Sequence, residues 1–135
     1  MKVCGKRLPV GFVWVSFFLM IPMVQAGSPD IEAAKRHAQS MMEEAKQVMN
    51  HGDQGHMDVM MSHAEGMIKH AQEAIEATPQ DNAHGKEAIS RLKQAVDHAE
   101  ELIPHARKGH QDAAMAHANK AFAHAKEAKK HIDQM

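Results

Sequence analysis

Hydrophobic residues recur at spacings of three and four along most of this chain, which is the pattern of amphipathic helices. The pattern is clearest in the last quarter. Its apolar positions there are Ala114, Met115, Ala118, Ala121, Phe122, Ala125, Ala128 and Ile132. Three earlier segments, at about 28–50, 54–77 and 82–108, carry similar stripes of small and aliphatic side chains. The sequence therefore predicts four helices separated by short breaks.

Residues typical of helix ends mark these breaks. Ser28, followed by a proline and an aspartate, predicts the start of the first helix as its capping residue. Glycines within 51–55 predict the end of that helix, and Asp53 is a candidate N-cap for the second. Residues 78–81 (TPQD) break the chain before the third helix, and Gly109 separates the third helix from the fourth.

The chain also contains an internal repeat, in which the second half follows the pattern of the first. When the halves are aligned, His51, His56, His63 and His70 coincide with His105, His110, His117 and His124. The first two helices are therefore one hairpin, and the last two are its copy. Helices of this length with short loops predict an all-α fold, an antiparallel up-and-down four-helix bundle built from two repeated hairpins. Its core would be rich in alanine.

Residues 1–26 have the organisation of a secretory signal peptide. Three basic residues within the first seven positions precede an apolar run at 10–24, and the small residue Ala26 supplies a cleavage point. A retained membrane anchor is the alternative, but the run is short for a span and contains Pro22. We expect an exported, periplasmic protein of residues 27–135 that forms one domain.

The exported chain would be acidic, poor in aromatic residues and free of thiols. The leader contains the only cysteine, three of the four phenylalanines and three of the 16 basic residues, which leaves 13 basic against 17 acidic residues. A net charge of −4 is unsuited to nucleic acid. Without cysteine, disulfides, thiolate metal sites and iron–sulfur clusters are excluded. All 12 histidines and nine of the 12 methionines remain, and they are the candidates for chemistry.

The histidines follow the helical stripe in phase. They occupy the g position of the heptad, the shoulder where the buried stripe meets water. The full set is His37, His51, His56, His63, His70, His84, His98, His105, His110, His117, His124 and His131. Seven residues rise about 10.5 Å along a helix, whereas metal–nitrogen bonds are about 2 Å long. Two successive rings on one helix therefore cannot share an ion, and other ligands must come from a neighbouring helix.

Antiparallel helices bring their g positions side by side, and residues at equal height across a hairpin have numbers with a constant sum. The expected facing pairs are His51/His56, His37/His70, His105/His110, His98/His117 and His84/His131. In the same rows Glu44 faces His63, and Arg91 faces His124. We expect these rungs to bind several metal ions.

Further donors lie within one helical turn of the histidines. Met41, Met60 and Met67 follow histidines by four residues, and Glu73, Glu87, Glu101 and Glu127 follow them by three. Imidazole with carboxylate suits Cu(II), Ni(II) and Zn(II), thioether beside imidazole suits Cu(I), and the affinity order favours copper. We expect copper, with nickel or zinc as alternatives, and expect Cu(I) on the first hairpin, which holds seven of the nine methionines. The alternative role for the methionines is packing in the core, and the alternative for the glutamates is a solvated position on an exposed helix face.

The repeated heptads HAEGMIK-HAQEAIE, HAEELIP-HARKG and HANKAFA-HAKEAKK-H, behind a signal peptide and without cysteine, resemble the small metal-binding protein family of nitrifying bacteria. The resemblance covers residues 28–132. It implies a periplasmic helical bundle that binds several copper ions, tolerates other divalent metals, and serves copper buffering or detoxification. The heptad histidines carry over one by one as ligands. This chain departs from the pattern at Glu44, Ala77, Arg91 and Asp112, where no histidine stands in the row, and in its methionine content.

Other functions have less support from the residues. The chain has no His-Glu-x-x-His motif, no glutamate three residues before a histidine, and no Cys-x-x-Cys-His motif, so we expect no enzyme. A b-type haem would find a poor lining in an alanine core. The stronger rival is a polypeptide-binding holdase or an envelope-stress protein, whose activity would survive mutation of the histidine row. A third is a pH-responsive module, since twelve imidazoles titrate together.

The expected partners are therefore metal ions, with neither nucleic acid nor, after cleavage of the leader, a membrane. We expect a monomer, and the sequence does not identify a protein to which it would deliver metal.

Overall fold

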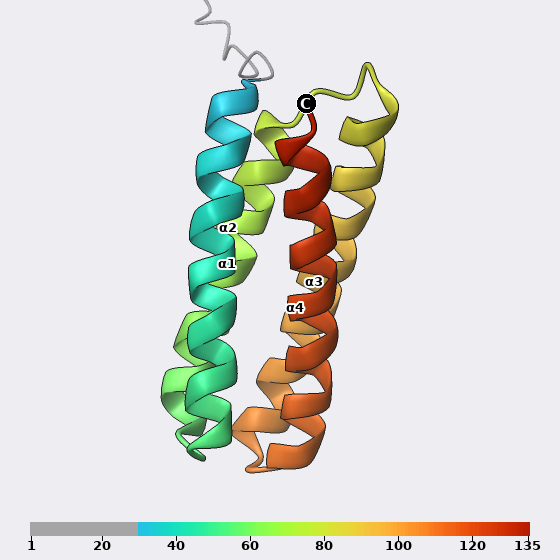
Figure 1. Ribbon diagram of the computed structural model, residues 1–135. Coiled ribbons are helices and arrows are strands. Elements are labelled where there is room, and N and C mark those ends of the chain that lie inside the picture. The colour runs from blue at the N-terminus through green and yellow to red at the C-terminus, as the bar shows by residue number, and fades with distance from the viewer. Residues whose placement is uncertain (1–29) are drawn as a thin grey trace, which may run out of the picture.

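The computed structural model describes residues 30–135, which form four helices and no strand. The helices are α1 (Ile31–Asp53), α2 (Met57–Ala77), α3 (Ala83–Arg107) and α4 (Gln111–Asp133). They run alternately up and down (Figure 1). The predicted four-helix bundle is thus confirmed. The predicted signal peptide, residues 1–26, lies outside the described residues.

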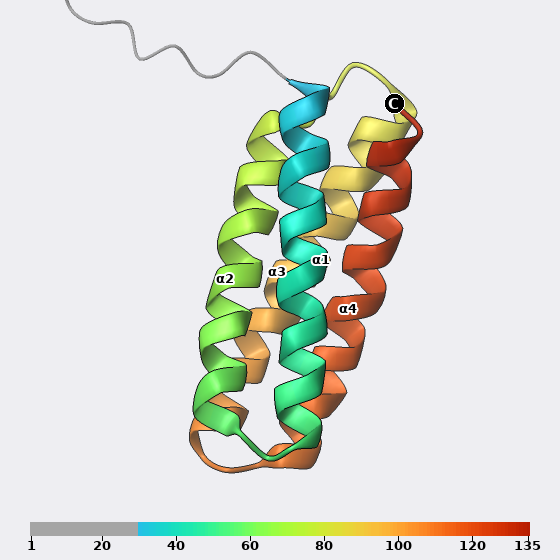
Figure 2. The same cartoon turned by 60° about the vertical axis from the view of Figure 1, so that its left-hand side comes forward.

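Each helix packs against two neighbours, so that the bundle is a square in the order α1, α2, α3, α4. The closest pairings are α1 with α2 and α3 with α4, which are the two hairpins of the repeat. Figure 2 shows both hairpin turns at one end of the bundle, while the α2–α3 loop and the C-terminus lie at the other. We call the end with the two hairpin turns the turn end.

The first helix begins later than the sequence predicted. Its N-cap is Asp30, not Ser28, and the Asp30 carboxylate accepts hydrogen bonds from the backbone N–H groups of Glu32 (3.0 Å) and Ala33 (3.3 Å). A carboxylate there also suits the positive end of the helix dipole. The start predicted near Asn82 is confirmed, since the Asn82 side chain caps α3 by accepting from the N–H of Gly85 at 2.8 Å.

The hairpin turns differ in detail from the prediction. The first helix continues through Asp53, and α2 begins at Met57 after His56, so Asp53 is not an N-cap. The reason is that Gly55, with φ of 73°, makes the left-handed turn that ends α1, while Gly52 remains helical. Gly109, with φ of 72°, repeats this turn between α3 and α4 and confirms the predicted break.

The bundle core is built mainly from alanine. Fifteen of the 24 buried hydrophobic residues are alanines, which lets the helices approach closely. The buried residues form two clusters along the axis. The cluster nearer the hairpin turns, here called the lower cluster, comprises Val48, Met60, Ala64, Leu102, Ala106, Ala114 and Ala118, with Met49, Met57, Met61, Ile103 and Met115 packed against it.

Within residues 30–135, none of the four helices has the length and the apolar composition that a membrane crossing requires.

Candidate metal centre

Histidines face one another along both hairpins, as the constant-sum rule predicted. The ring centroids are 6.2 Å apart for His37/His70, 5.9 Å for His51/His56, 5.6 Å for His84/His131, 5.7 Å for His98/His117 and 6.0 Å for His105/His110. All five expected pairs are therefore brought together. We call the row along α1 and α2 the first histidine seam and the row along α3 and α4 the second histidine seam.

The shoulder position decides how far these rings are buried. Nine of the twelve histidines are partly buried, and the three exposed ones are His56, His84 and His110, at the beginnings of α2, α3 and α4. The ring of His117, for example, has a side-chain exposure of 22%. The helices thus hold the rings between them while leaving a side open to solvent, which suits a ligand that must enter from water.

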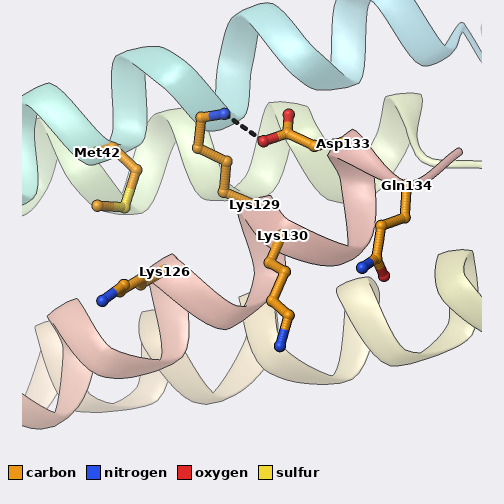
Figure 3. Close-up of a pocket in the computed structure, with 6 residues that line it drawn as sticks. All are labelled: Met42, Lys126, Lys129, Lys130, Asp133 and Gln134. Carbon is orange, nitrogen blue, oxygen red and sulfur yellow. Dashed lines mark hydrogen bonds and ion pairs between the residues drawn. The ribbon is translucent and has the colours of Figure 1, made fainter.

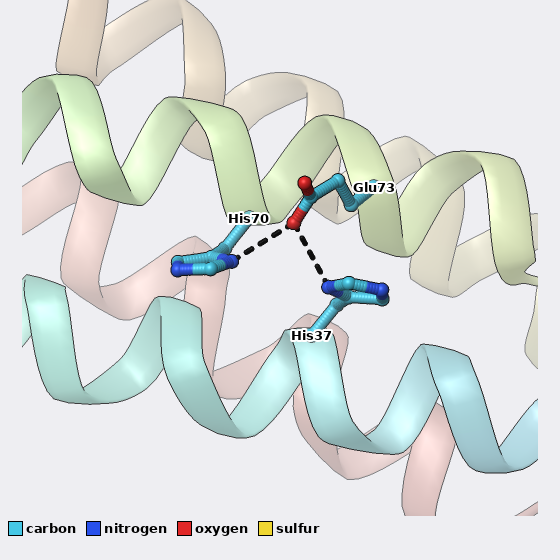
Figure 4. Close-up of side chains that lie close together, drawn as sticks. All are labelled: His37, His70 and Glu73. Atoms are coloured by element: carbon cyan, nitrogen blue, oxygen red, sulfur yellow. Dashed lines mark hydrogen bonds and ion pairs between the residues drawn. The ribbon is translucent and has the colours of Figure 1, made fainter.

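A glutamate joins one histidine pair in the first seam (Figure 4). Oε2 of Glu73 lies 2.9 Å from Nδ1 of His37 and 3.0 Å from Nδ1 of His70. The first histidine comes from α1, while the other two residues come from α2, one helical turn apart. The three ligand atoms lie within 4.8 Å of one another. Two imidazoles and a carboxylate therefore converge on one point of the hairpin.

The second seam carries a group of the same composition. Oε2 of Glu101 lies 3.0 Å from Nδ1 of His98 and 2.9 Å from Nδ1 of His117. Here α3 supplies the glutamate and one histidine, and α4 supplies the other. We call these two groups the first triad (His37, His70, Glu73) and the second triad (His98, His117, Glu101).

The two triads are not related by the internal repeat. In the alignment of the two hairpins, the first triad corresponds to Arg91, His124 and Glu127, and the second corresponds to Glu44, His63 and Gln47. Each hairpin therefore builds its triad at a different height. In the second hairpin Arg91 stands where the first triad has His37, and in the first hairpin Glu44 stands where the second triad has His98.

The other glutamates proposed as donors have other partners. Glu87 binds Nε of Arg91 at 2.9 Å, and Glu127 lies 3.6 Å from Nζ of Lys130. Both follow a histidine by three residues, as the triad glutamates do. A nearby cation thus decides which carboxylate is left for the imidazoles. The expected contact of Glu44 with His63 is present, with Oε2 at 2.7 Å from Nδ1.

Diagonal contacts, which the constant-sum rule does not predict, extend the rungs. Stacked rings join His51 to His63 (5.3 Å), His105 to His117 (5.4 Å) and His98 to His124 (5.6 Å). The second seam therefore contains an unbroken run of neighbouring rings, His110, His105, His117, His98 and His124. The constant-sum rule compares only equal heights, whereas these pairs are offset by one heptad.

Several ring nitrogens have no hydrogen-bond partner although they are buried. Nδ1 of His51, His105 and His117 are in this state. For His117 the Glu101 oxygen is close, but the contact lacks the direction of a hydrogen bond. Buried polar atoms are rarely left unsatisfied in a folded protein. In the tautomer whose proton is on Nε2, such an Nδ1 has a lone pair that a metal ion can accept.

The surroundings shift the pKa values of three groups toward their metal-binding forms. The hydrogen bond from His70 lowers the pKa of Glu73, assisted by the charge of His37, and the hydrogen bond from His98 lowers the pKa of Glu101 in the same way. Burial, with the charges of His98 and Arg91, lowers the pKa of His124. Anionic carboxylates and neutral imidazoles are the forms that coordinate a cation.

The methionines proposed beside the histidines belong to the core. Met41, Met60 and Met67 are at most 1% exposed and are among the largest fully buried side chains. These three side chains therefore lie in the core, away from the open side of the histidine seams.

A groove on another face is lined mainly by lysines. It runs along α4 beside Met42 of α1, and Figure 3 shows Lys126, Lys129 and Lys130 at its edge. Nζ of Lys129 binds Asp133 at 2.6 Å. This basic groove supplies no set of donors for a cation, which leaves the seams as the candidate site.

The geometry agrees with the comparison against known families. A search of curated proteins found no match. The family model described as "Small metal-binding protein" matches residues 13–128, which is most of the chain. The four-helix fold and the two triads are consistent with metal binding, the property for which that family is named. The chain belongs to the small metal-binding protein family.

Proposed function

We propose that this protein captures copper ions reversibly on its two histidine seams, after export to the periplasm, and so buffers, stores or detoxifies the metal. The observation that carries the proposal is the presence of one His–His–Glu triad in each hairpin. Family membership supports a metal ligand. The proposal involves no catalysis and treats the chain as a monomer whose partners are the ions.

The donor set explains the choice of metal. Two imidazole nitrogens and a carboxylate oxygen suit Cu(II), Ni(II) and Zn(II), and among these copper binds most tightly to a given nitrogen and oxygen site. Donors around one ion, with bonds of about 2 Å, lie within about 4 Å of one another. The triad atoms, now within 4.8 Å, reach that arrangement by small rotations of partly exposed side chains.

Binding is reversible for two reasons: the triads are open to solvent, and protons compete with the ion for the same atoms. Each triad offers three protein donors on an open surface, so water completes the coordination and exchange is not blocked. In the metal-free protein the triad carboxylates accept hydrogen bonds from imidazole. An ion must displace those protons, so acid competes with metal at the same nitrogens. Ion release on acidification from pH 7 to pH 5 is therefore part of the proposal.

Calorimetric titration of the purified protein with Cu(II) and Zn(II) tests the metal role. We expect at least two ions per chain, and loss of the tightest sites in the His70→Gln, His117→Gln double variant. A matched control, Lys46→Gln with Lys93→Gln, changes two exposed residues outside the seams and should bind as the wild type does. Less than one ion per chain, or unchanged binding by the histidine variant, contradicts the proposal.

Export is tested separately. Residues 1–26 fused to a reporter enzyme that is active only outside the cytoplasm should give activity. Replacement of Lys2, Lys6 and Arg7 by glutamate should abolish it, because the basic region of the leader is required. Equal activity of both fusions, or none with the native leader, contradicts the periplasmic location.

A further inference from the structure

The strongest feature outside the histidine seams lies in the lower cluster, near the turn end. Gly52 is a buried glycine inside α1. The sulfur atoms of Met60 and Met115 both lie within 3.2 Å of the point that a Cβ on this glycine would occupy. Two thioether sulfurs thus converge where the helix lacks a side chain.

The two methionines come from helices that are not neighbours. Met60 lies on α2 and Met115 on α4, which are diagonal in the square, and α1 packs against both. Both sulfurs can lie next to Gly52 because this residue has no side chain to exclude them. Sites in helical bundles are commonly built this way, from side chains of several helices that point inward. This site would join the two hairpins, whereas each histidine seam lies within one.

The internal repeat shows that the second hairpin fills the equivalent positions with different residues. In the second hairpin the residues equivalent to Gly52 and Met60 are Ala106 and Ala114, which are both buried in the same cluster. Two alanines therefore fill the equivalent place in the second hairpin. Glycine is the less favourable residue inside a helix. The first hairpin keeps glycine where its copy has alanine, and the space is used by sulfur.

The surroundings favour a soft ion. Five of the twelve residues of the lower cluster are methionines. Met60 is fully buried, while Met115 is only partly buried and gives access from solvent. Thioether ligands are neutral and polarisable, and they select Cu(I) over divalent ions.

We infer that Met60 and Met115, over Gly52, form a thioether site for a soft monovalent ion, copper(I), between the two hairpins. Its role in copper handling rests on the proposed function, but its residues are not those of the triads. The protein then has two classes of site: imidazole–carboxylate sites for divalent ions on its surface, and one sulfur site for the reduced ion in the lower cluster.

Silver(I) is the probe, because it is a redox-inert monovalent ion that binds thioethers. In the full protein labelled with ¹³C at the methionine methyl groups, one equivalent of Ag(I) should shift the Met60 and Met115 signals in NMR spectra and leave that of Met41 in place. Met115→Leu keeps the side-chain volume and should weaken Ag(I) binding at least tenfold. Met41→Leu, the matched control in the other core cluster, should not.

Gly52→Ala gives a second, independent test. The new methyl group overlaps Sδ of Met115, a flexible side-chain end that can move away, so the fold should survive and Ag(I) binding should fall at least tenfold. The control Ala106→Gly makes the reverse change in the other hairpin and should leave binding intact. Unshifted methionine methyls, equal shifts at Met41, or full binding by Met115→Leu would overturn the inference.

Failure of this inference is distinguishable from failure of the proposed function. The His70→Gln, His117→Gln variant should lose divalent ions and keep the Ag(I) shifts of Met60 and Met115. If that variant loses both, the sulfur site is not independent and the inference is wrong. If wild type binds Cu(II) and Zn(II) but Ag(I) moves no methionine signal, only the inference fails.

Discussion

At the scale of single residues, a carboxylate between two imidazoles distinguishes the triads from the other histidine pairs. Glu101 and Glu87 both follow a histidine by three residues, but Glu101 contacts two imidazoles and Glu87 is bound to Arg91. The same residue type at the same spacing therefore has two different roles. The position of the nearest competing cation decides between them.

This difference makes a direct prediction. Glu101→Gln should lower the affinity of one Cu(II) site by at least about tenfold, since removing even an outer partner of a metal ligand commonly costs about 10- to 100-fold. Glu87→Gln, the same change at a glutamate outside the triads, should leave all sites unchanged. Competition with a chromophoric chelator measures both. Equal affinities in the two variants would exclude Glu101 as a ligand.

A second prediction concerns the pKa of His124, which burial lowers and the charges of His98 and Arg91 lower further. Arg91→Gln should raise this pKa part of the way toward 6.5, because burial remains. Arg36→Gln, which removes the same charge from α1, should not. The pH dependence of the His124 ring signal in NMR spectra of the metal-free protein measures the effect, and an unchanged pKa in Arg91→Gln would contradict it.

The lowered pKa values also determine how the stability of the fold changes with pH. Because the folded pKa of His124 is lowered, the folded state resists protonation and loses stability as the pH falls below about 6.5. Glu73 and Glu101 act in the same direction at lower pH, since their lowered pKa values give a stabilisation that is present above about 4.5 and is lost as acid protonates them. Urea unfolding of the metal-free protein should therefore show a lower midpoint at pH 5 than at pH 7, and a smaller drop in Arg91→Gln.

The histidine pairs could be predicted from sequence because heptad phase and turn position fix the heights of residues on rigid rods. Which of the four glutamates three residues after a histidine would join a pair could not be predicted, because such a flexible side chain also reaches lysine or arginine on its own helix. Lys130 takes Glu127 in this way. Sequence spacing brings donors within reach, and competition among rotamers then selects the contacts.

At the scale of helices, glycine decides where each element ends and how closely another segment approaches. The sequence predicted that the first turn lies within residues 51–55. It did not predict which glycine adopts positive φ, and the structure shows that this is Gly55. Two glycines among polar residues in a short stretch offer several registers of similar energy. Packing against α4 selects one, since Gln111 Nε2 donates to the carbonyl oxygen of Gly52 at 2.8 Å.

Gly85 provides a test at this scale. A Cβ on Gly85 would overlap the carbonyl oxygen of Pro79, which is backbone and cannot rotate away. Gly85→Ala should therefore lower the free energy of unfolding by about 1–3 kcal/mol, as overpacked cores do, despite the better helix propensity of alanine. Urea unfolding followed by circular dichroism measures this loss.

Gly66→Ala is the matched control. Gly66 lies within α2, and its new Cβ would meet only the flexible side chain of Glu44, at 3.0 Å. The helix propensity of alanine is better by up to about 1 kcal/mol, so this variant should be neutral or more stable. A larger loss in Gly66→Ala than in Gly85→Ala would show that the close approach of Pro79 is not what requires a glycine.

At the scale of the whole molecule, the two seams lie within hairpins, and the hairpins are joined mainly by an alanine core. Alanine buries little apolar surface per residue, so a bound ion has a large effect on such a bundle. An ion at a hundredfold excess over its dissociation constant adds about 2.7 kcal/mol per site, and 1 kcal/mol raises the melting temperature of a domain of this size by about 4–8 °C.

Zinc(II), which brings no redox chemistry, should therefore raise the melting temperature by about 10 °C or more, measured by circular dichroism at pH 7. Chelator should reverse the shift, and the shift should be smaller at pH 5, because protons compete with the ion for the imidazole nitrogens. The Glu73→Gln, Glu101→Gln double variant should show a smaller shift than wild type. A melting temperature that does not change with zinc would mean that the seams do not hold the ion in the folded state.

The unbroken run of rings in the second seam also limits how many ions that hairpin can carry. His117 faces His98 within its own rung and also stacks on His105 of the adjacent rung. An imidazole that donates one lone pair serves a single ion. Filling the second triad therefore leaves His105 and His110 to serve a neighbouring ion without His117. The capacity of the hairpin is set by its supply of lone pairs and not by its number of rungs, so successive ions should bind with falling affinity.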